Sequence, residues 1–413
     1  MRIANPLIKV LAINCGSSTL KFQLFELGGE EKRHSQQRQL ARGLVDEIGT
    51  KGTLNFTIES TESFRKSLAI GDHDAATRQA LAWLESSGLL GRGEPCAVGH
   101  RVVHGGSRFT AAALIDDQVL AAIEAVSELA PLHNEPALRA IYAAREELGA
   151  NVPMVAIFDT TFHSTLPKWA SNYAIPEDLA AKHGVRRYGF HGIAHRFMTE
   201  RYCDITSKPI ERAKLITLQL GNGCSATAVA QGHSIDTSMG FTPLEGLMMG
   251  TRSGDLDPSL PGFLARREGV GIEEIEDWLN TRSGLLGVSG RSRDMRTLLQ
   301  AAQQGDTRAE LAVEMFCYRV RKYIGAYLAV LGGADAVVFG GGIGENAAEI
   351  RSRICAGMEW CGLRLDEERN AKAVGSEGRI SADDAKVHAH VITVDESIMI
   401  ARETVRCLQN HGK

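Results

Sequence analysis

The spacing of apolar residues in the first part of the chain predicts strands and helices in alternation. Residues 8–13 form an apolar run that stops at the polar turn 14–18, and in residues 20–27 apolar positions alternate with polar ones. This pattern is typical of two strands joined by a tight turn. Helical spacing of Ala, Leu, Ile and Val predicts helices at 75–89, 117–129 and 137–148. Continuous apolar runs predict buried strands at 97–103 and 152–158.

The second half repeats this order of elements. Strands are predicted at 215–220, just after 225, at 336–339 and at 391–393. Helices are predicted from about 347 and at 396–408. Residues 13–18 read INCGSS and residues 220–225 read LGNGCS, so the apolar residue, a glycine and the last serine coincide. A single match of this kind can arise by chance, but its occurrence once in each half favours two related α/β domains.

Length and composition narrow the class of protein. A chain of 413 residues exceeds one ordinary core, so two domains are expected. Apolar residues make up 44% of the chain and charged residues 23%, which predicts a soluble protein with large cores. The formal net charge of −4 gives no reason to expect nucleic acid or a membrane surface as a partner. Any anionic ligand must therefore be held by local positive groups.

The eight cysteines predict no disulfide framework and no zinc site, because none form a CxxC pair or a His/Cys cluster with zinc spacing. They are expected to be reduced thiols in a cytoplasmic protein. The N-terminal segment lacks the layout of a signal peptide. The longest apolar run, 326–344, contains Asp335 and several glycines, so it is not expected to span a membrane.

Three glycine-rich turns follow strands, at 14–19, 221–225 and 340–346. Free backbone N–H groups in such turns can converge on an anion, and three of them in one chain favour phosphate binding over ordinary turns. A GxxxxGK[ST] motif is absent, so the chain is not a P-loop enzyme. Lys21 could supply a point charge to a phosphate, although a solvated strand lysine is the alternative.

Charged and imidazole side chains stand at strand ends and in glycine-rich loops. Arg101 and Arg252 are flanked by apolar residues and glycines, which favours a bound carboxylate or phosphate over a structural ion pair with, for example, Asp255 or Asp257. Asp159 ends a predicted strand, where ligand sites of α/β proteins lie; helix capping is the alternative.

Two histidines, His191 and His195, share the segment RYGFHGIAH. Their spacing could place two metal ligands on one helical face, but the glutamate of HExxH is absent and Gly192 interrupts the segment. A histidine that donates to a phosphoryl oxygen suits His191 better. His195 is expected to be a structural histidine.

Ten segments together resemble the acetokinase family, which contains acetate, propionate and butyrate kinases. They run in family order from residue 10 to about 404: NCGSSTLKFQL, GHRVVHGG, LAPLHNEPAL, FDTTFHSTLP, YGFHGIAHRF, LGNGCSATAV, DTSMGFTPLEGLMMGTRSGDLDP, SGLLGVSGRSRDMR, GGGIGEN and VDESIMIARET. Nearly the whole chain is covered, and the segment around Arg252 is long and specific.

The resemblance implies the fold shared by sugar kinases, actin and heat-shock ATPases. Each of two duplicated domains would be built on a mixed five-stranded sheet, with a nucleotide cleft between the domains. The N-terminal domain is expected at 1–161 plus 397–413, and the C-terminal nucleotide-binding domain at 162–396. Members of the family are Mg²⁺-dependent homodimers, and Mn²⁺ is an alternative metal.

Matching positions imply a role for each residue. The expected metal residues are Asn14 and Glu396, acting through water. The expected catalytic residues are Asp159, His191, Arg252 and Arg101, of which Arg101 also binds the substrate carboxylate. The expected ATP-binding residues are Ser17, Thr19, Lys21, Gln219, Leu220, Gly221, Asn222, Gly223, Asp294, Met295, Arg296, Gly342, Ile343, Gly344, Glu345 and Asn346. The expected apolar pocket for the substrate's methyl group is made of Val103, Leu132, Phe190 and Pro243.

One position departs from the family. The second hairpin of the family usually begins with histidine, where this chain has Gln219. Glutamine can still donate a hydrogen bond but cannot carry charge, so phosphate affinity or pH response is expected to differ.

The expected reaction is reversible transfer of the γ-phosphoryl group of ATP to acetate, giving acetyl phosphate and ADP; propionate is the alternative acid. A carboxylate needs no base near pH 7, so catalysis is expected to be positioning and charge neutralisation, with Asp159 orienting Arg101 or metal-bound water. Two other classes stay open. A sugar or polyol kinase would use Asp159 as a base, and a non-catalytic nucleotide-binding protein would need neither arginine.

Overall fold

The computed structural model describes residues 7–28, 37–59, 63–91 and 96–411; in α3, the side chains of Pro131 and Leu132 lie outside the description. The chain divides into two compact units. Unit 1 contains residues 1–161 and 395–413, and unit 2 contains residues 162–394. The sequence places the return of the chain to the first domain at residue 397, and that domain boundary stays a prediction. Of the helices in the described ranges, none combines the length and the apolar character needed to cross a membrane.

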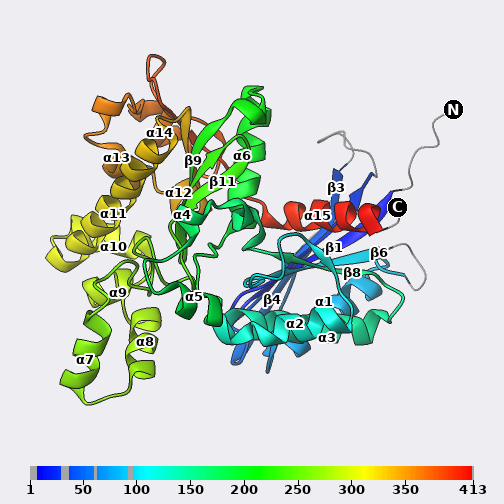
Figure 1. The fold of residues 1–413 in the computed structure, drawn as a ribbon. Helices are drawn as coiled ribbons and strands as arrows, with labels where there is room; N and C mark the ends of the chain where they lie inside the picture. The colour runs from blue at the N-terminus through cyan, green and yellow to red at the C-terminus, as the bar shows by residue number, and fades with distance from the viewer. Residues whose placement is uncertain (1–6, 29–36, 60–62, 92–95, 412–413) are drawn as a thin grey trace. The chain divides into compact units, whose positions relative to one another are not determined.

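Unit 1 is a sheet with helices on both faces (Figure 1). Its strands are β1 (Ile8–Cys15), β2 (Leu20–Leu27), β3 (Gln37–Asp46), β4 (Lys51–Ile58), β5 (Phe64–Ala69), β6 (Cys96–Val102), β7 (Ala113–Leu114) and β8 (Met154–Phe158). Its helices are α1 (His73–Ser86), α2 (Asp117–Ala125), the 3-10 turn η1 (Ser127–Leu129), α3 (Pro131–Leu148) and the C-terminal α15 (Glu396–His411). The strand order among the described residues is β5-β4-β3-β2-β1-β6-β8-β7.

Opposite faces of the unit 1 sheet are covered by helices from distant parts of the chain. On one face α15 contacts β1, β6 and β8. Gly99 in β6 permits this approach, because a Cβ there would lie 2.3 Å from Thr404 Oγ1 and 2.7 Å from Ile400 Cγ2. On the other face Val98 packs in one apolar cluster with Ala140 and Ala144 of α3. The last sixteen-residue helix is therefore part of the core of the first unit.

Unit 2 contains a second sheet and most of the helices. Its strands are β9 (Lys214–Leu220), β10 (Cys224–Ala230), β11 (His233–Thr237), β12 (Ala336–Gly340), β13 (Gly378–Arg379) and β14 (His388–Val391). Its helices are α4 (Lys168–Ser171), α5 (Glu177–His183), α6 (Gly192–Thr206), α7 (Leu260–Glu268), α8 (Ile272–Thr281), α9 (Gly284–Ser289), α10 (Met295–Gln303), α11 (Thr307–Leu331), α12 (Gly341–Asn346), α13 (Ala348–Cys355) and α14 (Glu367–Lys372). Short 3-10 turns are η2 (Thr161–Thr165, which begins at the end of unit 1), η3 (Ile210–Arg212) and η4 (Glu359–Cys361).

The two sheets share one five-stranded arrangement. In unit 1 it is β3-β2-β1-β6-β8 and in unit 2 it is β11-β10-β9-β12-β14. In each, the first three strands are antiparallel neighbours and the last three are parallel ones. The expected mixed five-stranded sheet is therefore the centre of each unit; β4, β5 and β7 extend the first sheet and β13 extends the second. The two similar glycine turns, 13–18 and 220–225, occupy the same place in both arrangements, between the central strand and its antiparallel neighbour.

Several predicted elements have different bounds in the structure. Residues 341–346 form the short helix α12, where the sequence predicts a glycine turn, because Gly341 (φ +76°) makes the bend alone. The last strand lies at His388–Val391 and not at 391–393, since it pairs in parallel with β12 from Ala336 onward. Helix 117–129 ends at Ala125 and continues as a 3-10 turn. The strands from 37 to 69 were not predicted.

Aspartates fix where several helices begin. The side chains of Asp72, Asp116 and Asp306 accept hydrogen bonds from the first-turn N–H groups of α1, α2 and α11. These bonds satisfy donors that have no partner within a helix. At the other end of α11, Gly332 takes a left-handed conformation (φ +62°), which ends the 25-residue helix.

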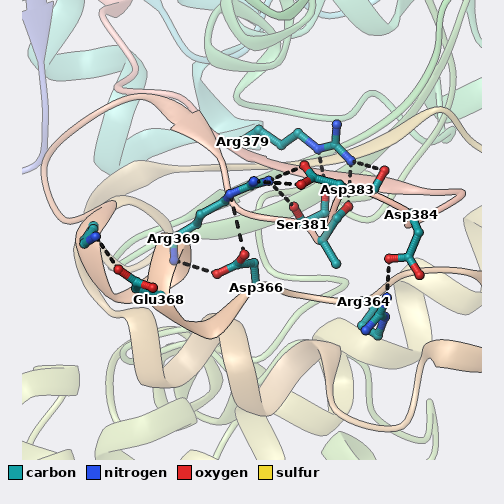
Figure 2. A network of polar contacts seen from close by, with 10 residues as sticks. Arg364, Asp366, Glu368, Arg369, Arg379, Ser381, Asp383 and Asp384 are labelled. Carbon is teal, nitrogen blue, oxygen red and sulfur yellow. Dashed lines mark hydrogen bonds and ion pairs between the residues drawn. The ribbon is translucent and has the colours of Figure 1, made fainter.

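A network of ion pairs and hydrogen bonds connects side chains of residues 364–384, the segment that contains β13 (Figure 2). Arg369 lies 2.7 Å from Asp383 and 3.5 Å from Asp366, and Arg364 pairs with Asp384. Arg379 donates to the Ser381 hydroxyl at 3.0 Å. Asp383 and Asp384 are largely exposed, so water and salt screen these pairs. We therefore infer that these ion pairs hold the local conformation of this segment and add little to the stability of the unit.

The packing of α15 on β6 gives a testable prediction. The Gly99→Ala substitution forces a methyl group against Thr404 and Ile400, and overpacking of this kind costs about 1–3 kcal/mol. We expect the free energy of unfolding, measured by urea denaturation, to fall by that amount. The matched control is Gly71→Ala, where a Cβ would meet no atom within 4 Å. Equal stability of the two variants would contradict the described docking of α15.

Candidate active site

Polar side chains of unit 1 gather where parallel strands end. Asn14 is near the end of β1, Arg101 is near the end of β6, and Asp159 directly follows β8. These strands are neighbours in the sheet and run parallel. The carboxyl ends of parallel strands are where α/β proteins bind ligands. Glu396, the first residue of α15, joins them from the other end of the chain.

The four side chains form one continuous chain of hydrogen bonds. Arg101 donates to both oxygens of Asp159, from Nε at 3.0 Å and from Nη2 at 2.5 Å. Its Nη1 donates to Asn14 Oδ1 at 2.9 Å. Asn14 Nδ2 then donates to Glu396 Oε2 at 2.7 Å. The predicted carboxylate-binding arginine, the predicted catalytic aspartate and the two predicted metal residues are therefore linked in one chain of contacts.

Burial makes the pairing of Arg101 and Asp159 strong. The Asp159 side chain is 0% exposed and that of Arg101 is 14% exposed. Desolvation by itself lowers the pKa of Arg101, but the negative charges of Asp159 and Glu396 outweigh it and the pKa is raised. The Arg101 guanidinium therefore stays protonated. Because both oxygens of Asp159 accept from Arg101, the carboxylate is engaged as an orienting group.

The first glycine turn is a tight hairpin. Gly16 N donates to Thr19 O at 2.8 Å, and Lys21 in β2 pairs in register with Asn14. Ser17 and Lys21 are exposed. His73, which the sequence did not single out, contacts Gly16 O through Nε2 at 2.8 Å from the start of α1. The only sequence signal for it is its place just after the capping residue Asp72.

In unit 2, the structure brings His191, Arg252 and the second glycine turn together. A Cβ placed on Gly223 would lie 3.3 Å from His191 Nε2 and 3.5 Å from Arg252 Nη2. His191 precedes α6 with φ +57°, a left-handed conformation that is uncommon for a residue other than glycine. Its Nδ1 lies 2.8 Å from Ser225 Oγ. Two side chains able to donate to phosphoryl oxygens thus flank one backbone turn.

The loop that carries Arg252 is fixed by the same turn. Gly250 N donates to Asn222 O at 2.9 Å, and Arg252 Nη1 donates to Pro243 O at 2.8 Å. The Asp255 carboxylate accepts hydrogen bonds from Gly246 N and from the Tyr323 hydroxyl. Asp257 accepts from Ser259 N.

Gln219 and Leu220 end the strand that leads into this turn. Leu220 is buried in the core of unit 2. Gln219 pairs across the sheet with Ser225, so its side chain lies on the same face as that hydroxyl. The Gln219 Oε1 atom is buried and has no hydrogen-bond partner among the described residues.

The remaining predicted ATP-binding residues fall into two groups within unit 2. Asp294 caps α10, accepting from Arg296 N and Thr297 N, and it pairs with the exposed Arg296 side chain at 2.8 Å. Met295 is buried. The other group is α12, which holds Gly342, Ile343, Gly344, Glu345 and Asn346. Glu345 Oε1 accepts from Gly341 N at 2.9 Å and Val394 N at 3.0 Å, so this carboxylate ties α12 to the segment after β14.

Arg351 holds α12 by donating to its backbone carbonyl oxygens. The sequence analysis did not identify this residue. Its guanidinium is fully buried and donates to the carbonyl oxygens of Gly344, Glu345, Asn370 and Ala373. Burial lowers the pKa of Arg351 to about 10. A signal for it is absent from the local pattern, because Arg351 lies in an ordinary helical segment.

The residues predicted to form the substrate pocket lie in both units. Val103 in unit 1 and Phe190 in unit 2 are buried, with exposures of 4% and 1%, and Pro243 is half-buried. Leu132 lies in α3, with its side chain outside the described part of the chain. A shared pocket therefore stays a prediction.

The two histidines of RYGFHGIAH contact one serine hydroxyl. His191 Nδ1 and His195 Nε2 both contact the Ser225 hydroxyl, at 2.8 and 2.7 Å. In the described ranges, no group of three or more His, Cys, Asp or Glu side chains could hold a metal ion. His195 is fully buried, as expected of a structural histidine, but it contacts the same hydroxyl as His191.

Comparison with known proteins points to one family. A model described as the acetokinase family matches residues 9–402. Acetate kinase of Chloroherpeton thalassium is 47% identical over 413 residues, covering 97% of this chain and 99% of that one. Acetate kinase of Methanosarcina thermophila is 47% identical over 410 residues, covering 98% of each.

Solved structures agree with the sequence comparison. The crystal structure of Porphyromonas gingivalis acetate kinase matches with a TM-score of 0.87 and 40% identity, covering 97% of this chain and 100% of that one. A propionate kinase from Francisella tularensis matches with a TM-score of 0.88 and 40% identity, covering 97% and 99%. The predicted α/β fold with two duplicated domains is confirmed.

Proposed function

The chain belongs to the acetokinase family, and we propose that it transfers the γ-phosphoryl group of ATP reversibly to acetate, giving acetyl phosphate and ADP. The transfer is direct and in line. An acetate oxygen forms the new bond to γ-phosphorus while the bond from γ-phosphorus to the bridging oxygen of ADP breaks. The relatives from Chloroherpeton thalassium and Methanosarcina thermophila, each 47% identical to this chain, are acetate kinases, which supports acetate as the acid.

The observation that carries this proposal is the way Arg101 is held. A guanidinium has five N–H donors. Three of them are used, by Asp159 twice and by Asn14 once, and the other two have no partner among the residues that the structure describes. Asp159 and Asn14 therefore fix the plane of Arg101 and leave two donors for a substrate carboxylate. Arginine binds carboxylates with paired donors of this kind.

Catalysis in this proposal is charge neutralisation. The acid is already an anion near pH 7, so no general base is required. Arg101 holds the carboxylate, while His191 and Arg252 donate to the oxygens of the transferring phosphoryl group, where charge lies in the transition state. Asp159 keeps Arg101 in orientation. A sugar or polyol kinase would need Asp159 as a base, and both of its oxygens are engaged by Arg101.

The residues present fit Mg²⁺, with Mn²⁺ as the alternative. Mg²⁺ prefers oxygen ligands and is commonly held by one or two carboxylates, substrate phosphates and water. Glu396 supplies a carboxylate, and Asn14 holds it in place through a 2.7 Å hydrogen bond. Bound there with ATP, the ion would neutralise phosphate charge. We further propose that the enzyme is a cytoplasmic homodimer, as the resemblance implies.

Propionate is the second candidate acid, because a propionate kinase structure matches as well as an acetate kinase structure does. A coupled assay of ADP formation with acetate, propionate and glycerol tests the whole proposal. We expect the highest kcat/KM with acetate and no turnover of glycerol. Turnover of glycerol alone would replace the proposal with a polyol kinase, and turnover of none of the three would remove it.

The two arginines give a quantitative prediction. Arg101→Ala and Arg252→Ala should each lower kcat by about 10²–10³-fold, equal to about 3–4 kcal/mol of transition-state stabilisation, while KM for ATP changes little. Steady-state kinetics measures both values. The control is Arg38→Ala, which removes an exposed arginine paired only with Glu59 among the contacts described for it.

Folding defects need a separate check for Arg101. Arg101→Ala removes the guanidinium that pairs with the buried Asp159 carboxylate, which is destabilising. The double variant Arg101→Ala/Asp159→Ala removes that charge and should recover stability without recovering activity. If a folded Arg101→Ala or Arg252→Ala variant has near-normal turnover, the substituted arginine is part of a structural ion pair and does not act in catalysis.

Acid preference should depend on Val103. One methylene in an apolar pocket is worth about 1–3 kcal/mol, so acetate should be preferred over propionate by about 10- to 200-fold at most. Val103→Ala should lower KM for propionate and butyrate and hardly change kcat with acetate. The matched control is Val102→Ala, because Val102 packs in a separate apolar cluster of unit 1. A higher wild-type kcat/KM for propionate would make the enzyme a propionate kinase by the same mechanism.

Gln219 should contribute to ATP binding through its amide. Its buried, unpartnered Oε1 and its place opposite Ser225 put the side chain at the second glycine turn. Gln219→His should retain activity, and Gln219→Ala should raise KM for ATP or lower kcat. Initial rates over a range of ATP concentrations measure both. Unchanged values in Gln219→Ala would show that the amide does not act at the site.

A further inference from the structure

The side-chain amide of Asn134, near the start of α3, makes two hydrogen bonds to one backbone residue of unit 1. His104 N donates to Asn134 Oδ1 at 3.0 Å, and Asn134 Nδ2 donates to His104 O at 3.0 Å. Both residues are 0% exposed. His104 belongs to the 103–106 loop, which directly follows β6. These two bonds, the Asn134–His104 pair, therefore join α3 to the loop away from water.

The orientation of the amide is assigned by its two partners. Its oxygen faces a backbone N–H, and its nitrogen faces a backbone carbonyl oxygen. The opposite orientation would set donor against donor and acceptor against acceptor. Two bonds to one residue restrict both the distance and the relative direction of the two segments, whereas a single bond would allow rotation about it.

Val103 lies between this pair and a second fixed point. On one side, Val102 O accepts a hydrogen bond from Asp159 N at 3.0 Å, so the end of β6 is tied to the segment after β8. On the other side, both backbone polar groups of His104 are bonded to Asn134. Val103 is 4% exposed. The backbone position of Val103 therefore depends directly on the Asn134–His104 pair.

The rest of the 103–106 loop is also held in one conformation. Gly105 N donates to Thr160 Oγ1 at 3.3 Å, and Gly106 N donates to His104 Nδ1 at 2.9 Å. The Gly105 backbone packs closely on Phe158, because a Cβ there would lie 3.0 Å from two ring carbons. The loop is thus a compact segment, to which Asn134 gives a polar attachment from α3.

Attachment of α3 to the sheet does not by itself require a buried amide. An apolar cluster already joins the helix to β6 and its surroundings; it includes Val102, Phe109, Phe158, Ala137, Leu138 and Ile141. Burying an amide is costly unless its hydrogen bonds are made. Apolar contacts tolerate small shifts, whereas a buried pair of hydrogen bonds holds one geometry. The Asn134–His104 pair is therefore suited to fixing position within an interface that apolar packing stabilises.

The two joined segments carry the unit 1 residues that are predicted to surround the substrate's methyl group. Val103 directly precedes His104 in the loop, and Leu132 lies two residues before Asn134 in α3. The backbone separation of loop and helix therefore contributes to the room that these two residues leave for the carbon chain of an acid. A change of about one methylene in that room is enough to alter the choice between acids.

We propose that Asn134 is a specificity-determining positioning residue, whose amide fixes the distance between the 103–106 loop and α3 and thereby favours acetate over longer acids. This inference rests on the proposed function, in which Val103 and Leu132 contact the acid. Asn134 acts through the position of these residues and does not itself touch the substrate.

The ratio of kcat/KM for acetate to kcat/KM for propionate tests the proposal. Asn134→Ala removes both hydrogen bonds and should lower this ratio by about 3-fold or more, because a loop that is less restrained accommodates the extra methylene. KM for ATP should stay nearly unchanged. A purely structural role would lower activity with both acids alike and leave the ratio as it is. A wild-type ratio in folded Asn134→Ala, together with a changed ratio in Val103→Ala, would overturn the proposal.

Two further variants separate the hydrogen bonds from side-chain volume. Asn134→Asp has nearly the same shape and keeps the acceptor for His104 N, but it loses the donor to His104 O, so the ratio should fall here as well. In the Val103→Ala background, Asn134→Ala should lower the ratio by less than it does in the wild-type enzyme, because both changes act on the same pocket residue. An unchanged ratio in Asn134→Asp, or an equal further fall in the double variant, would contradict the proposal.

A control variant tests whether any lost buried hydrogen bond in unit 1 changes the ratio. Thr404 is 0% exposed, and its hydroxyl donates to Ile400 O at 2.8 Å within α15. Thr404→Val should leave the ratio of the two acids unchanged. An equal fall in the ratio would show that it responds to general loosening of unit 1, and the assignment to Asn134 would be wrong.

A measurement on the wild-type enzyme keeps the proposal testable if the Asn134 variants do not fold. Amide hydrogen exchange followed by NMR, without substrate, should show the His104 N–H exchanging at least about 10²-fold more slowly than in an unstructured peptide. Exchange at the unstructured rate would overturn the proposal. If the wild-type enzyme turns over neither acid, the proposed function fails and this inference fails with it. If Val103→Ala changes the ratio and the Asn134 variants do not, this inference alone fails.

Discussion

A guanidinium buried among strands needs an anionic partner, and in unit 1 this requirement organises the candidate site. Arg101 lies near the end of β6, and its charge is balanced by Asp159 at the end of the neighbouring strand β8. With two donors committed to Asp159, the third reaches Asn14, which in turn holds Glu396. The pair thus connects both parallel strands and the C-terminal helix. It also fixes the orientation of the donors that remain, and fixed donors are what recognition of a carboxylate requires.

In the second unit, hydroxyl, imidazole and backbone groups hold the residues around the second glycine turn. Its sheet repeats the five-stranded order of the first, so β9 and β10 hold the second glycine turn where β1 and β2 hold the first. The contacts described around that turn include hydroxyl, imidazole and backbone groups and the Arg252 guanidinium. Phosphates bring their own negative charge, and preorganised neutral donors can stabilise it without a buried counter-charge.

The helices and loops around each site are supported by residues that make no proposed contact with substrate. Arg351 holds the carbonyl oxygens of α12, and Asp255 holds the loop that carries Arg252. His163 holds the carbonyl of Phe190. Each of these groups is buried or half-buried, so an unmade hydrogen bond would be costly. Site geometry and local stability therefore depend on the same bonds.

The sequence by itself determined the class of fold, the family and the residue types of the site. Strand spacing, glycine turns and long motifs are local properties, and the duplicated turns at 13–18 and 220–225 do occupy equivalent places in the two sheets. Local patterns did not predict β3 to β5, whose weak alternation depends on pairing with neighbours for its register. They also did not indicate that Ser225 joins His191 to His195, that Arg351 supports α12, or that Asp159 uses both oxygens on Arg101. Partners such as Arg101 and Asp159 lie 58 residues apart, and a hydrogen bond depends on separations of tenths of an ångström that only the folded chain sets.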